Sequence, residues 1–343
     1  MSEIFTLPEK QLMTVLSWFR SRYALFLELS LERKANRENI EHFGKVWVGE
    51  FKIDWTEAFE SLIEKNILKK DDDEYDFTEY GNEIKGKIEA ETPFFKYEYD
   101  NFFNLEKQSK AHSLFCERVY GKDLSQHGLI DQEELSVLIE KLKKQNPDKI
   151  LDIGCGNGKI TKEIAKEIQA ECLGIDISSE GIKEANLQNK QNLKVRFQEG
   201  NFNNFLISEK FDATLFLDTL YFADNLTKTV QDSLKLLNKN GRLYAYFSQW
   251  IMDEAYNENL KPENTHLGKV LKELNLDFSV TDLTQSGIGH WKKKLQLLEE
   301  MKQDFLEENN EALWQYRFRE ANRYANWGDT KYSRFLYEVK GLL

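Results

Sequence analysis

Three glycines follow a short apolar segment in the middle of the chain and could bring the backbone close to a ligand. Residues 149–153 (KILDI) predict a buried strand, and Gly154, Gly156 and Gly158 come directly after it, before a helical pattern. Glycine permits a sharp turn and a close approach, and the N-terminus of the next helix offers free N–H groups. A dinucleotide-binding loop would have glycine where this chain has Lys159. The spacing therefore favours a nucleoside ligand with a carboxylate over one with a pyrophosphate.

Polar residues also follow the next three predicted strands. Asp176 comes about 20 residues after the glycine loop, which is the place of an acid that binds ribose hydroxyls. Asn201 and Phe202 follow the third strand and could hold an adenine by a hydrogen bond and by stacking, and Asp218 and Tyr221 follow the fourth. A structural turn and a helix-capping acid are the alternatives. Because the carboxyl ends of parallel strands meet at one edge of a sheet, the convergence of these segments favours a binding site.

The elements that must position these residues alternate between apolar strands and amphipathic helices from about residue 148 onward. Strands are expected near 149–153, 171–175, 193–198, 211–217, 241–248, 277–283 and 333–339. Helices are expected near 158–168, 179–189, 223–237 and 263–274, with a long helical stretch near 289–326. This alternation predicts an α/β fold with a doubly wound, mostly parallel seven-stranded sheet.

The chain divides into three regions that differ in their predicted secondary structure. Residues 1–90 predict an α-helical, winged-helix-like domain, because a helix near 55–65 precedes two short strands and a further helix. Residues 91–145 are expected to form a helical lid or connector, and residues 146–343 the sheet domain, with a helical insertion at about 285–330.

The stretch from about Lys149 to Ser248 resembles the class I S-adenosylmethionine-dependent methyltransferases in motif order and spacing. The resemblance implies the Rossmann-like methyltransferase fold, S-adenosyl-L-methionine as cofactor, and ribose hydroxyls bound by Asp176. Where that family usually has Asp, this chain has Asn201, so a neutral amide would contact the adenine amino group. The expected cofactor-binding residues are Asp152, Gly154, Cys155, Gly156, Asn157, Gly158, Asp176, Ile177, Asn201, Phe202, Leu217, Ser125 and Gln126.

Residues 115–128, before the sheet, are similar to a segment of small-molecule methyltransferases, including those that act on amines and phosphoethanolamine. By that likeness the segment folds over the cofactor and places Tyr120, Ser125, Gln126 and His127 near its methionine end and the acceptor. A loop histidine that bonds only to backbone is the equally weighted alternative for His127.

Candidate residues for the acceptor and for proton transfer lie around the same edge of the sheet. His127, Asp218 and His290 are the candidate general bases, in that order. An aromatic pocket would suit a sulfonium cofactor and a cationic amine, although aromatic residues at helical spacing usually form core. The expected substrate-binding residues are Tyr120, Tyr221, Trp250 and Trp291.

The composition of the chain limits the classes of molecule that it is expected to bind. The formal net charge is -12, which disfavours a nucleic-acid backbone, and no apolar run is long enough to cross a membrane. Three unpaired cysteines and the absence of a signal-like N-terminus predict a cytoplasmic protein, and five scattered histidines predict no metal site. Residues 1–90 contain 13 Lys and Arg against 19 Asp and Glu, so we expect this module to dimerise or to cover a substrate rather than to bind DNA.

Three functions remain after these steps. The first is methyl transfer to a small-molecule acceptor, most consistent with an amine nitrogen, by a protein that could form a homodimer. The second is an RNA or protein methyltransferase, which a basic groove across the strand ends would favour. The third is a catalytically silent regulator that binds the cofactor, against which the intact glycine loop and Asp176 count.

Overall fold

The computed structural model describes residues 5–20, 34–41, 55–91, 94–125, 127–189, 194–204, 207–250, 257–326 and 331–341. Gln126, an expected cofactor-binding residue, lies outside the described residues. The chain forms two compact units, Met1–Phe102 and Phe103–Leu343, which are described separately. The division falls after Phe102 rather than at residue 90, and the three functional modules stay a prediction.

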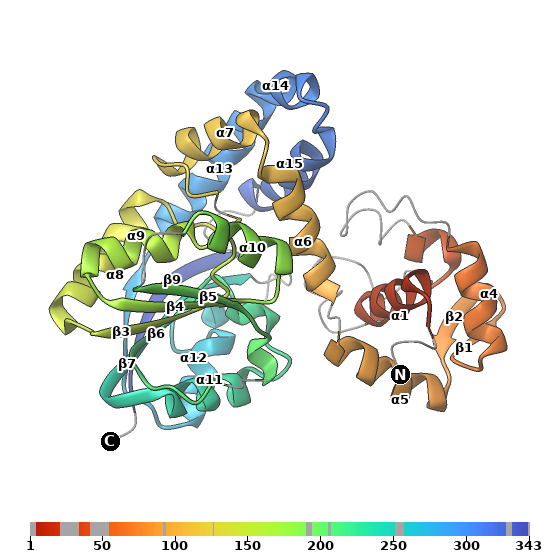
Figure 1. Ribbon diagram of the computed structural model, residues 1–343, viewed down its shortest axis with the longest axis horizontal. Coiled ribbons are helices and arrows are strands. Elements are labelled where there is room, and N and C mark those ends of the chain that lie inside the picture. The colour runs from red at the N-terminus through yellow and green to blue at the C-terminus, as the bar shows by residue number, and fades with distance from the viewer. Residues whose placement is uncertain are drawn as a thin grey trace. The chain divides into compact units, whose positions relative to one another are not determined.

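The first unit consists of helices around a small hairpin (Figure 1). It contains α1 (Leu7–Arg20), α4 (Thr56–Glu64), β1 (Leu68–Asp71), β2 (Glu74–Phe77) and α5 (Glu79–Glu91). The strands pair antiparallel through a two-residue turn, in which Asp72 has a φ of 55°. The helix, two strands and further helix expected near residues 55–90 are therefore present. Their core contains Leu12, Leu16, Phe59, Leu62, Tyr75 and Ile84.

The second unit is built on the predicted seven-stranded sheet (Figure 1). Its strands are β3 (Lys149–Ile153), β4 (Glu171–Asp176), β5 (Val195–Glu199), β6 (Phe211–Leu217), β7 (Leu237–Trp250), β8 (Phe278–Asp282) and β9 (Tyr332–Lys340). The order across the sheet is β5-β4-β3-β6-β7-β9-β8. The strand β9 runs in the direction opposite to that of the other six strands. The order reverses beside β3, so the switch point lies where the glycine loop begins.

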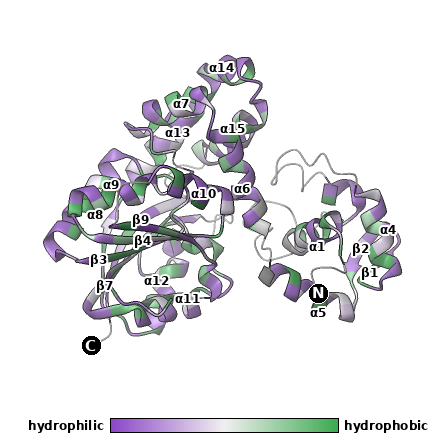
Figure 2. Ribbon diagram, in the orientation of Figure 1, coloured by the Kyte–Doolittle hydropathy of each residue, from purple (hydrophilic) through white to green (hydrophobic). Residues whose placement is uncertain are grey.

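Helices cover both faces of this sheet. One face carries α8 (Gln132–Gln145), α9 (Lys159–Ile168) and α10 (Ser179–Leu187), and the other carries α11 (Leu226–Lys235) and α12 (His266–Glu273). Short 3₁₀ turns are η1 (Phe202–Asn204), η2 (Leu220–Phe222) and η3 (Asn257–Leu260). The strands are mostly hydrophobic, whereas each helix has a hydrophilic side (Figure 2).

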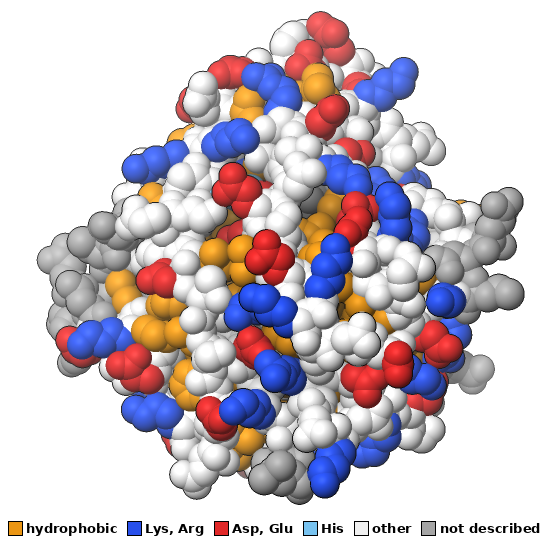
Figure 3. Space-filling view, turned by 90° about the vertical axis from the view of Figure 1, so that its left-hand side faces the viewer, with side chains coloured by type: hydrophobic (Ala, Val, Ile, Leu, Met, Phe, Trp, Pro, Cys, Tyr) orange, Lys and Arg blue, Asp and Glu red, His pale blue; other side chains and the backbone are white. Residues whose placement is uncertain are grey.

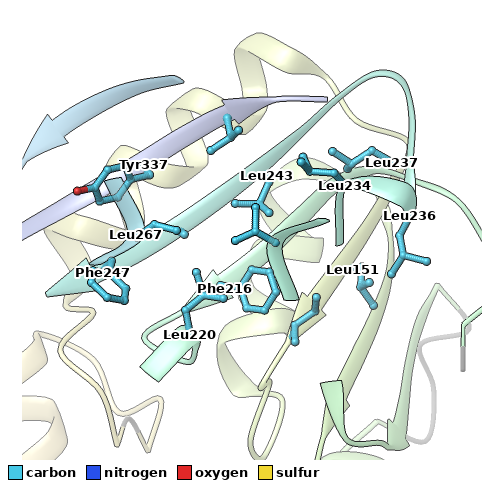
Figure 4. Packing of buried hydrophobic residues seen from close by; sticks show 14 of the residues in the cluster. Leu151, Phe216, Leu220, Leu234, Leu236, Leu237, Leu243, Phe247, Leu267 and Tyr337 are labelled. Atoms are coloured by element: carbon cyan, nitrogen blue, oxygen red, sulfur yellow. The ribbon is translucent and has the colours of Figure 1, made fainter. Parts of the chain in front are cut away.

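The surface and the interior of the molecule differ as expected for a globular protein. On the face drawn in Figure 3, basic and acidic side chains are interspersed. Beneath α11 and α12, strand residues such as Leu151, Phe216 and Leu243 pack with Leu234 and Leu267 into one cluster (Figure 4). This packing fixes the strands whose ends carry the candidate site.

A helical cap lies beyond one end of the sheet (Figure 1). It includes α7 (Lys110–Tyr120), α13 (Thr284–Glu300), α14 (Lys302–Glu307) and α15 (Glu311–Ala325), while α6 (Phe94–Glu106) crosses the boundary between the two units. The long helical stretch expected near 289–326 is present as three helices. The chain turns at Met301 and again at Asn309, whose φ is 56°.

Candidate active site

The glycine loop, residues 154–158, has the left-handed backbone that its composition predicts. The φ angles of Gly154, Gly156 and Gly158 are 83°, 55° and 72°. A Cβ on Gly154 would lie 2.2 Å from Cγ2 of Thr219, so packing as well as backbone geometry requires glycine there. Gly158 is the N-cap of α9, so the first turn of that helix adjoins the loop. The loop N–H groups of Gly154, Cys155, Gly156 and Gly158 already donate within the protein, so the first turn of α9 is the source of backbone donors for an anionic ligand group.

Asp176 lies at the end of β4, beside the glycine loop. Its Oδ2 accepts a hydrogen bond from the backbone N–H of Gly156 at 2.7 Å, and its Oδ1 accepts one from Ser178 at 2.8 Å. Ile177 lies between these contacts in the chain. Burial raises the pKa of the Cys155 thiol well above its usual range, which disfavours the reactive thiolate form. The structure brings the loop and the acid together, and their roles in binding stay predictions.

Asp152, inside β3, is a buried carboxylate with one unused oxygen. Its Oδ2 accepts a hydrogen bond from Thr161 Oγ1 at 2.5 Å, whereas its Oδ1 has no partner among the described residues. Burial raises the pKa of this carboxyl to about 7. Because a buried oxygen without a donor is costly, this position fits a ligand that brings an ammonium group.

A polar cluster beside the loop was not predicted. Asn157, an expected cofactor residue, is buried and its Nδ2 donates to Glu106 Oε1 at 3.0 Å. Burial, together with the charge of Glu184, raises the pKa of Glu106 to about 7. Lys159 Nζ donates to Ser125 Oγ, which ties the pre-sheet segment to α9. Glu106 lies at the end of a helix outside any motif, so no sequence signal marks it.

The expected adenine-binding residues lie at the ends of β5 and β6. Asn201 Oδ1 accepts a hydrogen bond from the backbone of Asn203 at 2.9 Å, so its side chain already caps a turn. The Phe202 ring meets the edge of the Phe216 ring, with 6.0 Å between centroids. Leu217, the last residue of β6, is half-buried. Adenine binding by these residues stays a prediction.

Asp218, a candidate base, is held in a buried ion pair. Arg334 on β9 donates from Nη1 to Asp218 Oδ1 at 2.6 Å and from Nη2 to Oδ2 at 3.0 Å. Arg334 also donates twice to Glu134, both times at 2.8 Å. The backbone of Leu129 and the hydroxyl of Tyr221 donate to Asp218 as well, at 3.1 and 3.2 Å. This carboxylate is therefore an anchor with its oxygens occupied.

His127, the first candidate base, lies in the pre-sheet segment. Its Nε2 is 2.6 Å from the hydroxyl of Tyr316 on α15. Burial lowers the pKa of His127 to about 3, so the ring is neutral at ordinary pH. Its ring nitrogen is engaged by the helical cap.

His290, the remaining candidate base, has a different environment. Its Nδ1 lies 3.8 Å from Asp131 Oδ2, and its Nε2 has no hydrogen-bond partner among the described residues. Its ring packs on Tyr120 with 4.8 Å between centroids. Burial, opposed by the contact with Asp131, lowers the pKa of His290 to about 4. A neutral imidazole whose Nδ1 faces a carboxylate leaves Nε2 as an acceptor.

Four aromatic residues, which we call the aromatic wall, connect the strand ends with the helical cap. Trp250 packs on Tyr221 at 5.6 Å and stacks on Tyr324 at 5.1 Å, and Tyr324 packs on Trp291 at 4.8 Å. The indole N–H groups of Trp250 and Trp291 have no partner among the described residues. The wall brings together three of the expected substrate-binding residues, whereas Tyr324 was not predicted.

Among the described residues, no group of three or more His, Cys, Asp or Glu side chains could hold a metal ion. No helix in the same part of the chain is both long and apolar enough to span a membrane.

Comparison with known sequences agrees with this geometry. Residues 144–310, just under half of the chain, match the model of the family described as Methyltransferase domain. The ubiquinone biosynthesis O-methyltransferase of Pelagibacter ubique is 31% identical over 97 residues, which cover 28% of this chain and 40% of the relative. The sterol 24-C-methyltransferase ERG6 of Saccharomyces cerevisiae is 25% identical over 211 residues, covering 60% and 50%. The chain thus spans about half the length of the curated relatives it matches.

Solved structures show the same fold. The phosphoethanolamine N-methyltransferase 2 of Haemonchus contortus, in complex with phosphomonomethylethanolamine and S-adenosylhomocysteine, has a TM-score of 0.55. It is 14% identical and covers 71% of this chain and 59% of its own. These comparisons confirm the Rossmann-like methyltransferase fold, and residues 144–310 are similar to methyltransferase domains.

Proposed function

We propose that this protein transfers a methyl group from S-adenosylmethionine to a small-molecule acceptor, and that the acceptor atom is an amine nitrogen. One observation carries the first half of the proposal. A glycine loop that ends at the N-terminus of α9 lies beside Asp176 and follows the buried Asp152, whose Oδ1 has no partner among the described residues. This combination suits a ligand that joins a nucleoside to an amino acid. S-adenosylmethionine is such a ligand, and it supplies an activated methyl group.

In this proposal, different residues bind different parts of the cofactor. Asp176 binds the ribose hydroxyls, and Asn201 and Phe202 frame the adenine. Asp152 Oδ1 receives the ammonium group of the methionine part, because that oxygen is otherwise unpaired in a buried place. Backbone N–H groups of the first turn of α9 receive the carboxylate.

The aromatic wall supports an amine acceptor. Ring faces attract cations at centroid distances below about 6 Å, most strongly where water is excluded. Trp291 is almost fully buried and already has Lys294 Nζ at 4.1 Å from its ring centroid. Tyr221 and Trp250, at the strand ends, are the wall residues next to the expected cofactor site.

His290 is the general base in this proposal. A general base needs an atom that can accept a proton from the group to be methylated. His290 Nε2 makes no hydrogen bond within the described residues. Asp131 faces its Nδ1 and favours the tautomer with the proton there. His127 and Asp218 are weaker choices, because Tyr316 and Arg334 already occupy their acceptor atoms.

In this proposal the first unit is a winged-helix-like module that dimerises or covers the substrate. Residues 1–90 carry 19 acidic against 13 basic residues, and α4 carries Glu57, Glu60 and Glu64. Phosphates would be repelled, so DNA is not the partner in this proposal. The protein works in the cytoplasm, as its cysteine content favours.

Titration calorimetry tests the cofactor, and a screen then tests the acceptor. S-adenosylhomocysteine is expected to bind with a 1:1 stoichiometry, whereas NADH is expected not to bind. A mass-spectrometric screen of small amines and phenols with S-adenosylmethionine should give methylated amines. Tight NADH binding would refute the cofactor assignment, and methylation of phenols alone would refute the nitrogen acceptor.

A further inference from the structure

Three consecutive residues in the pre-sheet segment are each held through the backbone by a different buried side chain. We call residues 127–129 the latch segment. The carbonyl of His127 accepts a hydrogen bond from Arg317 Nη1 at 2.9 Å, and the carbonyl of Gly128 accepts one from the hydroxyl of Tyr120 at 3.0 Å. The N–H of Leu129 donates to Asp218 at 3.1 Å. These partners come from α15, α7 and the end of β6.

The three partners are themselves linked and fixed. Arg317 Nη2 donates to the Tyr120 hydroxyl at 2.6 Å, so one guanidinium binds both the latch segment and its second holder. Arg317 and Tyr120 are almost completely buried. Asp218 is fixed in turn by its ion pair with Arg334. A guanidinium offers several donors in a rigid fork, which allows this double role.

The latch segment fits its place closely. A Cβ on Gly128 would lie 2.9 Å from Asp218 Oδ2, so the backbone comes within contact of the carboxylate that ends β6. On the other side, Lys159 Nζ donates to Ser125, which precedes the latch segment. Ser125 is therefore tied to the start of α9, beside the glycine loop, and Leu129 to the strand end that leads to Tyr221.

We propose that Arg317 is a positioning residue that holds the latch segment closed over the junction of the cofactor and acceptor sites. It acts through Tyr120 and through the backbone of His127, without touching the reacting groups. The helical cap thereby controls how long the cofactor product stays bound. The role in retaining the cofactor product rests on the proposed function, whereas the hydrogen bonds that hold the latch segment do not.

Hydrogen exchange of the full-length protein, followed by mass spectrometry, tests the latch. In Arg317→Met the amides of residues 127–131 should exchange at least tenfold faster than in the wild type. Arg323→Met is the matched control, because Arg323 lies in the last turn of the same helix and, unlike Arg317, its side chain does not bind the latch segment. Arg317→Lys should restore part of the protection, since an ammonium can bind one of the two oxygens.

A second variant and a second readout keep the test independent of global stability. Tyr120→Phe removes one hydroxyl and keeps the ring, and it too should speed exchange at residues 127–131 relative to the amides of β3 in the same protein, which report global unfolding. Dissociation of S-adenosylhomocysteine, followed by stopped-flow fluorescence, should be at least fivefold faster in both variants. Exchange at residues 127–131 that matches the wild type in both variants would overturn the latch. A wild-type protein that binds no S-adenosylhomocysteine would refute the proposed function and leave the exchange result standing.

Discussion

Arg334 and Asp218 lie 116 residues apart in the chain and form a two-pronged ion pair inside the protein. The pair joins the last strand to the end of β6, where Asp218 has a left-handed φ of 62°. Glu134, at the start of α8, completes the arrangement from the other side of the guanidinium. The edge of the sheet that carries the candidate site is therefore fixed by one arginine.

Removing this arginine should strongly destabilise the fold. Arg334→Met leaves two buried carboxylates without a cation, and we expect the free energy of unfolding to fall by about 3–5 kcal/mol. Urea denaturation measures this change. The triple variant Arg334→Met, Glu134→Gln, Asp218→Asn removes the charges as well and should recover at least half of the loss. Equal destabilisation of the single and triple variants would mean that packing, not charge, is the cause.

Cofactor affinity should depend on Asp176 and on the glycine loop. Asp176→Ala and Gly156→Val should each weaken S-adenosylhomocysteine binding at least tenfold, which is about 1.4 kcal/mol. The second change also puts a side chain where Phe103 Cζ lies 2.9 Å from the new Cβ. Glu171→Ala, at the exposed start of β4, is the control for calorimetry. Wild-type affinity in both variants would remove the basis of the cofactor assignment.

Binding of the same product should vary with pH through Asp152. Burial raises the pKa of this carboxyl to about 7, so the protein without ligand holds it protonated below that pH. An ammonium group binds the ionised form, and affinity should therefore rise from pH 5.5 to about 7 and then level off. Asp152→Asn should be weaker at every pH and lose this dependence. A sloping profile that survives in the variant would assign the effect to another group, such as Glu106.

His290 should be needed for the chemical step but not for cofactor binding. His290→Ala is expected to lower kcat by about 100-fold or more with the amine found in the screen, while S-adenosylhomocysteine affinity stays unchanged. Because the pKa of His290 is about 4, the wild-type rate should not lose this base between pH 6 and 8 and should fall only as pH approaches 4. His266→Ala, at an exposed position, is the control. Full activity of His290→Ala would leave the base unassigned.

Cofactor binding should survive deletion of residues 1–90. The second unit has its own two strand-and-helix cores, and every expected cofactor residue lies within it. The truncated protein should bind S-adenosylhomocysteine within about twofold of the full chain. Gel-shift experiments with DNA and RNA should show no complex for either protein at physiological salt. A salt-sensitive shift that disappears on truncation would favour the regulator hypothesis.

The strands and the glycine loop were predictable because their signals are local. The segments 149–153 and 211–217 match β3 and β6 exactly, since short apolar runs between turns admit few alternatives. β7 begins at Leu237 rather than near 241, because Leu237 already pairs with Phe211. The register then shifts before Arg242 pairs with Ala213, and Asn240 has a left-handed φ of 66° within this irregular stretch. The break at Asn309 shows only as an Asn-Asn pair, without glycine or proline to mark it.

The buried charges of the site could not be predicted in this way. Arg334 lies in a strand covered on both faces, where an isolated arginine in the sequence would equally suit a solvent-facing position. Arg317 follows a helical pattern that gives no sign of complete burial. Their partners are more than 100 residues away, so only the fold brings them together.

The ring of Phe103 has a consequence for how this chain can change during evolution. The ring atom Cζ would lie 2.9 Å from a Cβ at Gly156, and Cε2 would lie 2.9 Å from a Cβ at Gly181. One aromatic side chain therefore restricts two positions in different elements, the loop after β3 and the first turn of α10. Homologous chains with a larger residue at either glycine should have a smaller one in place of Phe103, so these three positions should covary.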